Sequence, residues 1–321
     1  MKAAVVTAFG NAPHYADIDD PVEDTMTGRV LAASVKNLDR SLVSGRHYGS
    51  SGLQPPFVPG VDGVVALPDG RRVYSQSTGP NGMMAECAAV DPARMVVLPS
   101  GLDDALAAAI PNPGLSAWFS LEYAAQVQPG QSVLILGATG VTGSVAAQLA
   151  KHRFGAGHVV VAGRNAERLA QLRRSGADDT LILGDDLTAQ VASRHAEQPF
   201  DAVLDYLWGP VAENTLAALS NAGLTAAYHR TRYVQIGAMA GDPISLPSAV
   251  LRSAGVTLTG VGFGSVPTEA QARANGEFLP ELFAMAAAGA LDIDVVRRPL
   301  ADVETVWTTP APAGARVVLI P

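Results

Sequence analysis

The sequence predicts an α/β protein in which a small β-rich barrel accompanies a doubly wound parallel sheet. Short apolar runs bounded by Gly, Pro and Asp fill the first third of the chain, which favours strands over long helices. From about Gln131 apolar strands alternate with helical periods, the pattern of βαβ units on a parallel sheet. The length of 321 residues agrees with about two domains of about 150 residues each.

The first third is expected to form an irregular barrel. The chain contains 32 Gly and 22 Pro, and these residues supply the tight turns that many short strands need. Strands are expected at Ala3–Thr7, Arg29–Val35, Gly63–Leu67 and Arg72–Ser75.

The middle of the chain carries six apolar runs with the length of buried strands, enough for a doubly wound sheet. They are Ser132–Leu136, Val159–Ala162, Thr180–Leu183, Ala202–Asp205, Tyr233–Ile236 and Val256–Thr259. A long helix is expected over Thr268–Ala288, followed by strands at Ile293–Arg297 and Val317–Ile320 that return to the barrel.

The composition argues against several classes of protein. Thirty acidic residues against 22 basic ones give a net charge of −8, and no basic cluster offers a surface for nucleic acid. The opening MKAAVVTAFG is too short for the apolar core of a signal peptide, and no run of about 18 apolar residues predicts a membrane span. The single cysteine, Cys87, excludes an intrachain disulfide and a four-thiolate zinc site. We expect a soluble, cytoplasmic protein.

The strongest local motif is a glycine-rich turn between a strand and a helix, in SVLILGATGVTGSVAAQLA. Gly137, Gly140 and Gly143 let bare backbone amides approach a pyrophosphate at a helix N-terminus. The spacing is GxxGxxG where GxGxxG is commonest, and a turn of this kind also occurs as plain packing. The βαβ context favours nucleotide binding, with Thr139, Val141 and Thr142 completing the turn.

The end of the second strand of the sheet predicts which nicotinamide cofactor binds. NAD sites usually place Asp or Glu there for the ribose 2′-hydroxyl, whereas a 2′-phosphate calls for Arg. Here the strand ends in Gly163, Arg164 and Asn165, and Arg168 lies one helical turn further on. The two arginines favour NADPH. The alternative is a solvated helix start.

Further residues are expected at the carboxyl ends of later strands, where open α/β sheets bind ligands. These are Gly237 and Ala238 after the fifth strand, and Gly262 and Phe263 after the sixth. The six histidines form no HxxxH or CxxH cluster, and a GxSxG nucleophile elbow is absent. The cofactor would therefore carry the chemistry, while the protein supplies orientation and electrostatics.

The order of motifs along the whole chain resembles the medium-chain dehydrogenase/reductase superfamily and, within it, the zinc-independent quinone oxidoreductases. The matching segments include MKAAVVTAFG, SVKNLDRSLVSGRHY, PPFVPGVDGVV, PNPGLSAWFSL, VLDYLWG, YVQIGAMAG and ARVVLIP. The resemblance implies a GroES-like barrel over residues 1–115, an inserted Rossmann domain over 116–262, and a return to the barrel over 263–321.

Departures from the zinc-dependent members of that family are informative. Those members carry a metal-binding Cys two positions after Ser34 and a His–Glu pair after Gly60, where this chain has Lys36, Val61 and Asp62. A protonated Lys and a Val cannot bind Zn²⁺. The resemblance implies that Lys36 is a hydrogen-bond donor or general acid near the nicotinamide or the substrate; the alternative is a surface lysine.

Other residues take their expected roles from the resemblance. Tyr48 corresponds to an aromatic residue that borders substrate and nicotinamide, with a packing tyrosine as the alternative, and Ser116 lies where the family's helix start meets the nicotinamide. Relatives commonly dimerise through the last Rossmann strand, here residues 256–261. Residues 224–230 look like an insertion with no assigned role.

Together these features predict an NADPH-dependent reductase of a planar, electrophilic acceptor, either a quinone or an α,β-unsaturated carbonyl, acting without zinc. Three rival hypotheses are a dinucleotide sensor, a structural protein without turnover, and a zinc-type alcohol dehydrogenase.

Overall fold

The computed structural model describes residues 1–321 apart from 22–25, 79–80 and 221–227, and apart from the side chains of Tyr48 and Phe263. The chain divides into two compact units. The first unit comprises Met1–Asn112 and Ala272–Pro321, and the inserted unit comprises Pro113–Gln271. An α/β fold with one unit inserted into the chain of another was predicted, and it is confirmed.

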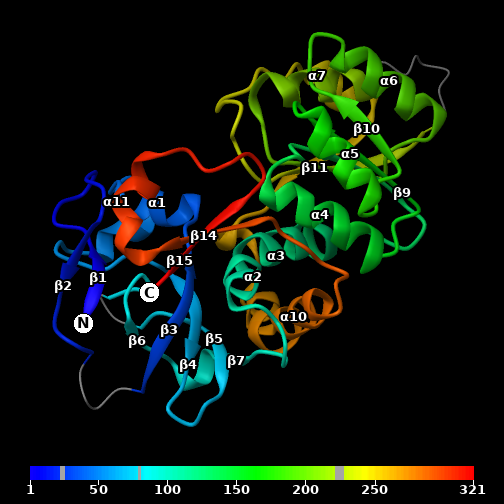
Figure 1. The fold of residues 1–321 in the computed structure, drawn as a ribbon. Helices are drawn as coiled ribbons and strands as arrows, with labels where there is room; N and C mark the ends of the chain where they lie inside the picture. The colour runs from blue at the N-terminus through cyan, green and yellow to red at the C-terminus, as the bar shows by residue number, and fades with distance from the viewer. Residues whose placement is uncertain (22–25, 79–80, 221–227) are drawn as a thin grey trace. The chain divides into compact units, whose positions relative to one another are not determined.

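The first unit is built mainly on antiparallel strands (Figure 1). Its larger sheet has the order β14-β15-β3-β4-β5-β7, with β6 also paired to β3, and β1 pairs with β2 in a second sheet. The strands are β1 (Lys2–Val5), β2 (His14–Asp17), β3 (Thr27–Ser34), β4 (Asp62–Ala66), β5 (Arg72–Gln76), β6 (Cys87–Ala89), β7 (Val96–Val97), β14 (Val295–Pro299) and β15 (Arg316–Ile320).

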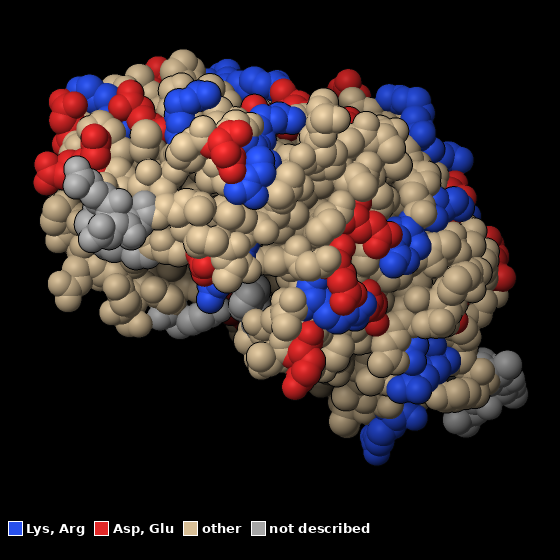
Figure 2. All heavy atoms as spheres, turned by 90° about the horizontal axis from the view of Figure 1, so that it is seen from below, with Lys and Arg blue, Asp and Glu red and all other residues tan. Residues whose placement is uncertain are grey.

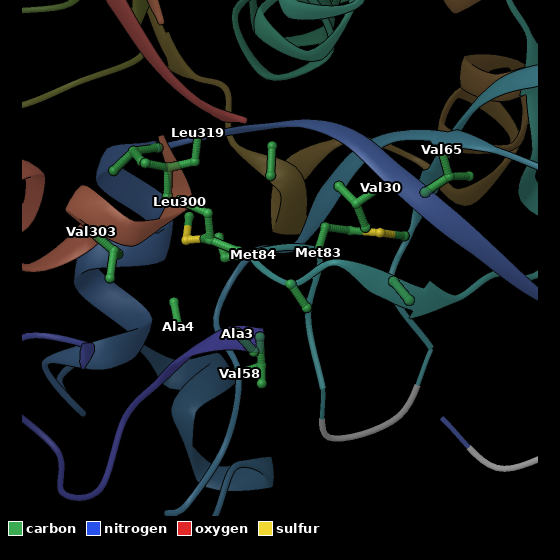
Figure 3. Packing of buried hydrophobic residues seen from close by; sticks show 14 of the residues in the cluster. Ala3, Ala4, Val30, Val58, Val65, Met83, Met84, Leu300, Val303 and Leu319 are labelled. Carbon is green, nitrogen blue, oxygen red and sulfur yellow. The ribbon is translucent and has the colours of Figure 1, made fainter. Parts of the chain in front are cut away.

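The end of the chain completes the sheet of the first unit. Strand β15 runs antiparallel to β3, with Val318 opposite Ser34, and parallel to β14. Its side chains enter the same core as the amino-terminal strand: Figure 3 shows Leu300, Val303 and Leu319 packed in one cluster with Ala3 and Ala4. The predicted return of the last strands to the barrel is therefore found in the structure.

Short helices connect these strands. In the first unit they are α1 (Asn37–Val43), the 3₁₀ turns η1 (Tyr48–Gly52), η2 (Pro92–Arg94) and η6 (Leu300–Asp302), α2 (Asp104–Ala109), α10 (Leu279–Ala287) and α11 (Val303–Thr308). The helix predicted over residues 268–288 is divided into α9 (Thr268–Arg273), a π-helical turn η5 (Ala274–Phe278) and α10.

The inserted unit is a six-stranded, fully parallel sheet with the order β10-β9-β8-β11-β12-β13. Numbered within the unit this is 3-2-1-4-5-6, the order of a dinucleotide-binding Rossmann fold. The strands are β8 (Ser132–Leu136), β9 (His158–Gly163), β10 (Asp179–Ile182), β11 (Ala202–Asp205), β12 (Arg230–Gln235) and β13 (Gly255–Gly260). All six predicted strands are present, with ends within three residues of those expected.

Helices and helical turns precede, link and follow the parallel strands (Figure 1). They are α3 (Pro111–Trp118) with a π-helical turn η3 (Phe119–Ala124), α4 (Val141–His152), α5 (Ala166–Arg174), α6 (Leu187–Glu197), α7 (Gly209–Ser220), α8 (Ser248–Ser253) and the turn η4 (Phe263–Ser265). The central strand β8 is buried along its whole length, as expected for a sheet covered on both faces. Because β8 lies in the middle of the sheet, the glycine-rich turn that follows it lies at the centre of the carboxyl edge of the sheet.

Charged side chains are dispersed on the face shown in Figure 2, where Lys and Arg lie among Asp and Glu and most atoms belong to other residues. Among the residues with a described position, no helix is long and apolar enough to cross a membrane.

Candidate functional site

The glycine-rich turn lies where β8 ends and α4 begins. Gly137 has a φ of +83°, in the left-handed region that favours glycine. A Cβ on Gly143 would lie 2.6 Å from the carbonyl oxygen of Gly137 and 2.7 Å from Cα of Ala138, so no larger residue fits there without moving backbone. Gly140 precedes α4 without a side-chain hydrogen bond to its first turn. The turn thus offers helix amides that its own cap residue does not cover, in the geometry that suits a phosphate.

The neighbouring strand β9 approaches this turn closely. A Cβ on Gly163 would overlap Cγ2 of Thr139, so glycine is needed for the Thr139 side chain to fit against the end of the strand. The amides of Gly137 and Ala138 both donate to the carbonyl of Ala162, at 2.9 and 3.0 Å. These contacts hold the turn and the end of β9 together as one surface.

Arg164 follows β9 and is exposed, and within the described part of the chain it makes no hydrogen bond or ion pair. The residue after it, Asn165, accepts a hydrogen bond from the backbone N–H of Arg168 at 3.1 Å and so begins α5. The Arg168 side chain donates to Oε1 of Gln171 at 2.9 Å, along the same helix. Arg164 is therefore the better placed of the two arginines to take up an anion, whereas Asn165 acts as a helix cap.

The later strands end at the same carboxyl edge of the parallel sheet. Gly237 follows β12, and a Cβ there would lie 2.8 Å from the carbonyl oxygen of Tyr206. Ala238 is exposed, and Gly262 follows β13 with its amide donating to Oγ of Ser265 at 2.9 Å. Phe263 begins η4, but its side chain lies outside the described part. Ser116 lies in α3, where its carbonyl accepts a hydrogen bond from Ser120 Oγ at 2.7 Å.

The structure adds a buried acid at this edge that sequence reasoning did not single out. Asp205, the last residue of β11, accepts hydrogen bonds from the amides of Leu207 and Trp208 at 2.8 and 3.0 Å, and from the Tyr233 hydroxyl at 2.6 Å. Burial raises the pKa of Asp205, and the bond from Tyr233 acts against that shift. An acid at the end of an otherwise apolar strand, in VLDYLWG, was the available clue.

The turn that Asp205 holds bears directly on the phosphate-binding turn. Trp208 has a φ of +58°, an uncommon conformation for a bulky residue. The Leu207 side chain lies only 3.0 Å from where a Cβ on Gly137 would stand. Asp205 and Tyr233 therefore position the residues on which the Gly137 backbone rests.

Lys36 lies in the first unit and is buried, with 1% of its surface exposed. It precedes α1, and its ammonium donates to Asp62 Oδ1 at 2.6 Å and to the carbonyl and hydroxyl oxygens of Ser34 at 3.1 and 3.2 Å. The surface-lysine alternative is wrong. The three N–H groups of the ammonium all have acceptors within the chain, so none is left to donate to a substrate oxygen.

The charge of Lys36 is stabilised where it lies. Burial alone would lower the pKa of Lys36, but the carboxylates of Asp39 and Asp62 outweigh it, and the pKa is raised above its ordinary value. For Asp39, an acid, burial acts in the other direction and raises its pKa. Tyr48 begins η1 in the same unit, and its side chain lies outside the described residues.

Comparison with known proteins places these features in a family. The family described as zinc-binding dehydrogenase matches this sequence over residues 141–276. A probable NADPH-dependent quinone reductase of Emericella nidulans is 26% identical, with 100% of both chains covered. A 2-methylene-furan-3-one reductase of Solanum lycopersicum is 34% identical over 56% of this chain and 51% of that protein.

Solved structures extend the likeness to the whole fold. The quinone oxidoreductase of Thermus thermophilus, solved also in complex with NADPH, is 28% identical with a TM-score of 0.80 and 100% of both chains covered. A mycobacterial quinone oxidoreductase has the same TM-score, 0.80, at 23% identity over 100% of both chains, a likeness of fold.

Proposed function

Since the chain belongs to the medium-chain dehydrogenase/reductase superfamily, we propose that it is an NADPH-dependent oxidoreductase that reduces a quinone or an α,β-unsaturated carbonyl without zinc. One observation carries this proposal: the uncapped helix start after Gly140 shares the sheet edge with the exposed Arg164. The first suits a pyrophosphate, and the second suits a further phosphate.

The residues present fit NADPH. Gly137 allows the tight turn, Gly140 would let a pyrophosphate approach the backbone, and Gly143 lets the helix start pack closely, because a Cβ there would strike the backbone of Gly137 and Ala138. Thr139, Val141 and Thr142 complete this surface, and Arg164 would hold the 2′-phosphate, with Arg168 adding positive charge. When bound, NADPH supplies a hydride.

The remaining cofactor contacts follow from the ends of the later strands. Gly237 and Ala238 after β12, and Gly262 and Phe263 after β13, are proposed to border the nicotinamide half, together with Ser116. Asn165 contributes by starting α5 and thereby fixing the direction in which Arg164 leaves the strand.

The acceptor needs little acid catalysis from the protein. Conjugation in a quinone or enone spreads the incoming negative charge onto an oxygen, where one hydrogen-bond donor suffices. We assign that donor to the Tyr48 phenol or to water. Lys36 keeps its three N–H groups on Ser34 and Asp62, so we propose that it acts on the site by positioning α1 and not by proton transfer. The names of the Emericella nidulans and Solanum lycopersicum relatives support the two acceptor classes.

The test is NADPH oxidation by purified protein with phenanthrenequinone, a simple benzoquinone and an enone in parallel. We expect turnover with at least one acceptor, and a much lower rate with NADH at equal concentration. Binding of NADPH without turnover on any acceptor would overturn the reductase and favour the dinucleotide sensor. Stoichiometric zinc in elemental analysis, with activity that depends on it, would instead favour the zinc-type alcohol dehydrogenase.

We further propose a cytoplasmic homodimer joined through residues 256–261. Strand β13 is the outermost strand of its sheet and has exposed residues such as Thr257 and Thr259. An open edge of β-branched residues is prone to pair with another strand. Light scattering at micromolar concentration is expected to give twice the chain mass of 33.1 kDa, and the mass of a single chain would contradict the dimer.

A further inference from the structure

We propose that the Lys36 ammonium is the permanent occupant of a closed, oxygen-lined cation site in the first unit, and that it thereby excludes a metal ion. The inference deepens the zinc independence included in the proposed function. Its geometry lies entirely within the first unit, so it can be tested without cofactor or acceptor.

Four oxygens surround the ammonium. Nζ of Lys36 lies 2.6 Å from Asp62 Oδ1, 3.1 Å from the Ser34 carbonyl oxygen, 3.2 Å from Ser34 Oγ and 3.5 Å from Asp39 Oδ2. The Asp39 and Asp62 side chains are only 0% and 8% exposed. A buried cation with carboxylate, hydroxyl and carbonyl oxygens around it has the ligand chemistry of a bound ion, but here the cation is tethered to the chain.

The two carboxylates keep other partners that do not depend on the lysine side chain. Asp39 accepts hydrogen bonds from the backbone amides of Lys36 and Val61 at 2.9 and 3.1 Å. Asp62 accepts one from the Tyr74 hydroxyl at 3.1 Å. Shortening residue 36 would therefore leave both carboxylates in place around an empty volume.

The buried carboxylates of Asp39 and Asp62 favour a cation in the volume that the Lys36 side chain occupies. Two carboxylates face the ammonium, and two arginines carry further positive charge near them. Arg316 donates to the carbonyl of Val35 at 3.2 Å, and Arg40 donates to the carbonyls of Val306 and Trp307. Burial lowers the pKa of Arg316, while the charges of Asp39 and Asp62 raise it. With the ammonium removed, the buried carboxylates lose the cation that donates to Asp62 at 2.6 Å and lies 3.5 Å from Asp39, which is costly unless a cation or a proton enters.

The same residues do not fit zinc, and the match to the zinc-binding dehydrogenase family covers residues 141–276 and not this site. Zinc ligands must present a lone pair, and a protonated lysine has none. Val61 is apolar, and the described residues contain no group of three or more His, Cys, Asp or Glu that could hold a metal ion. This chain satisfies its buried carboxylates with its own Lys36 side chain.

The experiment compares Lys36→Ala with Lys36→Met by thermal unfolding. Lys36→Ala removes three methylenes and the ammonium, so the matching probe is n-propylammonium chloride; 1-propanol is the neutral control of the same shape. We expect n-propylammonium to raise the unfolding midpoint of Lys36→Ala saturably. It should leave the wild type and Lys36→Met unchanged, since their residue 36 fills the volume.

Three outcomes would overturn the proposal. They are no rise for Lys36→Ala, an equal rise with 1-propanol, and an equal rise in all three proteins. The first would mean that a proton, and not a cation, relieves the carboxylates. Because the readout is unfolding, failure of the site leaves NADPH-dependent turnover untouched, and failure of turnover leaves this result standing.

A second comparison applies if Lys36→Ala does not fold. The variant Lys36→Met/Asp62→Asn removes both members of the pair and leaves no unmatched charge between them. A midpoint clearly above that of Lys36→Met would support a site built around the ammonium. Equal instability of the two variants would contradict it, because the loss would then come from packing alone.

Discussion

The turn at Gly137–Gly143 and the site around Lys36 both collect polar groups at the end of a buried strand, but they differ in whether those groups are satisfied. The turn presents helix amides that its cap residue leaves uncovered, beside the exposed Arg164. The Lys36 ammonium and its carboxylates satisfy one another within the chain. Unmet hydrogen-bonding capacity at an exposed edge indicates where a ligand enters, whereas a closed set of charges indicates an internal role.

The largest expected effect on the nucleotide site comes from a substitution at Gly143. Gly143→Ala places a Cβ against the backbone of Gly137 and Ala138, so the turn must open. We expect NADPH affinity, measured by calorimetry, to fall by about 100-fold or more, which corresponds to about 2.7 kcal/mol. The control is Gly276→Ala, which meets nothing within 4 Å and should bind NADPH as the wild type does. Wild-type affinity of Gly143→Ala would remove the turn from the site.

A substitution at Arg164 tests whether this residue is the source of the preference for NADPH over NADH. A charge-assisted hydrogen bond contributes about 1.5–3 kcal/mol, so Arg164→Ala should weaken NADPH binding by roughly 10- to 100-fold and leave NADH nearly unchanged. Arg174→Ala, exposed at the far end of α5, is the matched control. Equal losses for both nucleotides would show that Arg164 does not hold the 2′-phosphate.

A substitution at Tyr233 tests whether the hydrogen bond to Asp205 stabilises the residues that pack under the Gly137–Gly143 turn. Tyr233→Phe leaves Oδ2 of the buried Asp205 without the hydroxyl that donates to it, at an expected cost of about 1–3 kcal/mol in the free energy of unfolding. Tyr228→Phe changes an exposed tyrosine and should alter stability by no more than about 0.5 kcal/mol. Denaturant unfolding of both variants measures the difference, and equal stabilities would contradict the role given to Asp205.

The smallest effect concerns pH. Burial lowers the pKa of His195 below its ordinary value of 6.5, and the neighbouring His229 adds to the shift. The folded state then binds a proton less readily than the unfolded state, so this histidine reduces stability as pH falls below about 6.5. The amide of Phe200 donates to Nδ1 of His195 at 3.1 Å, a bond that protonation would break.

Removing that group should flatten the acid side of the stability profile. His195→Gln is expected to lose less stability than the wild type between about pH 6.5 and pH 5, measured by denaturant unfolding at each pH. An unchanged slope would mean that His195 is not a source of the acid sensitivity.

Much of the inserted unit was predictable because its elements follow local rules. Continuous apolar runs predicted β8 and β11 at the observed residues, and the glycine spacing predicted the turn between β8 and α4. The division of the helix over 268–288 by a π-helical turn was not predicted, although two residues in that run signal it: Gly276 lies in η5, and Pro280 lies in the first turn of α10. Whether NADPH contacts the predicted residues stays a prediction.

The Lys36 site shows what sequence reasoning could not supply. The sequence identified Lys36 and Asp62 as departures from a zinc site, but it left a surface lysine as an alternative. Only the fold brings β4 beside the start of α1, so that residues 26 positions apart form one ion pair. Asp205 was missed for the same reason, because its partner Tyr233 lies 28 residues away on another strand.

The most direct test of the central claim is the rate of NADPH oxidation with phenanthrenequinone by protein dialysed against a strong zinc chelator. If the nucleotide binds at the Gly137–Gly143 turn and Lys36 takes the place of a metal ion, the rate of turnover should be the same before and after dialysis. Loss of activity on dialysis with recovery on adding Zn²⁺, or no turnover in either sample, would contradict it.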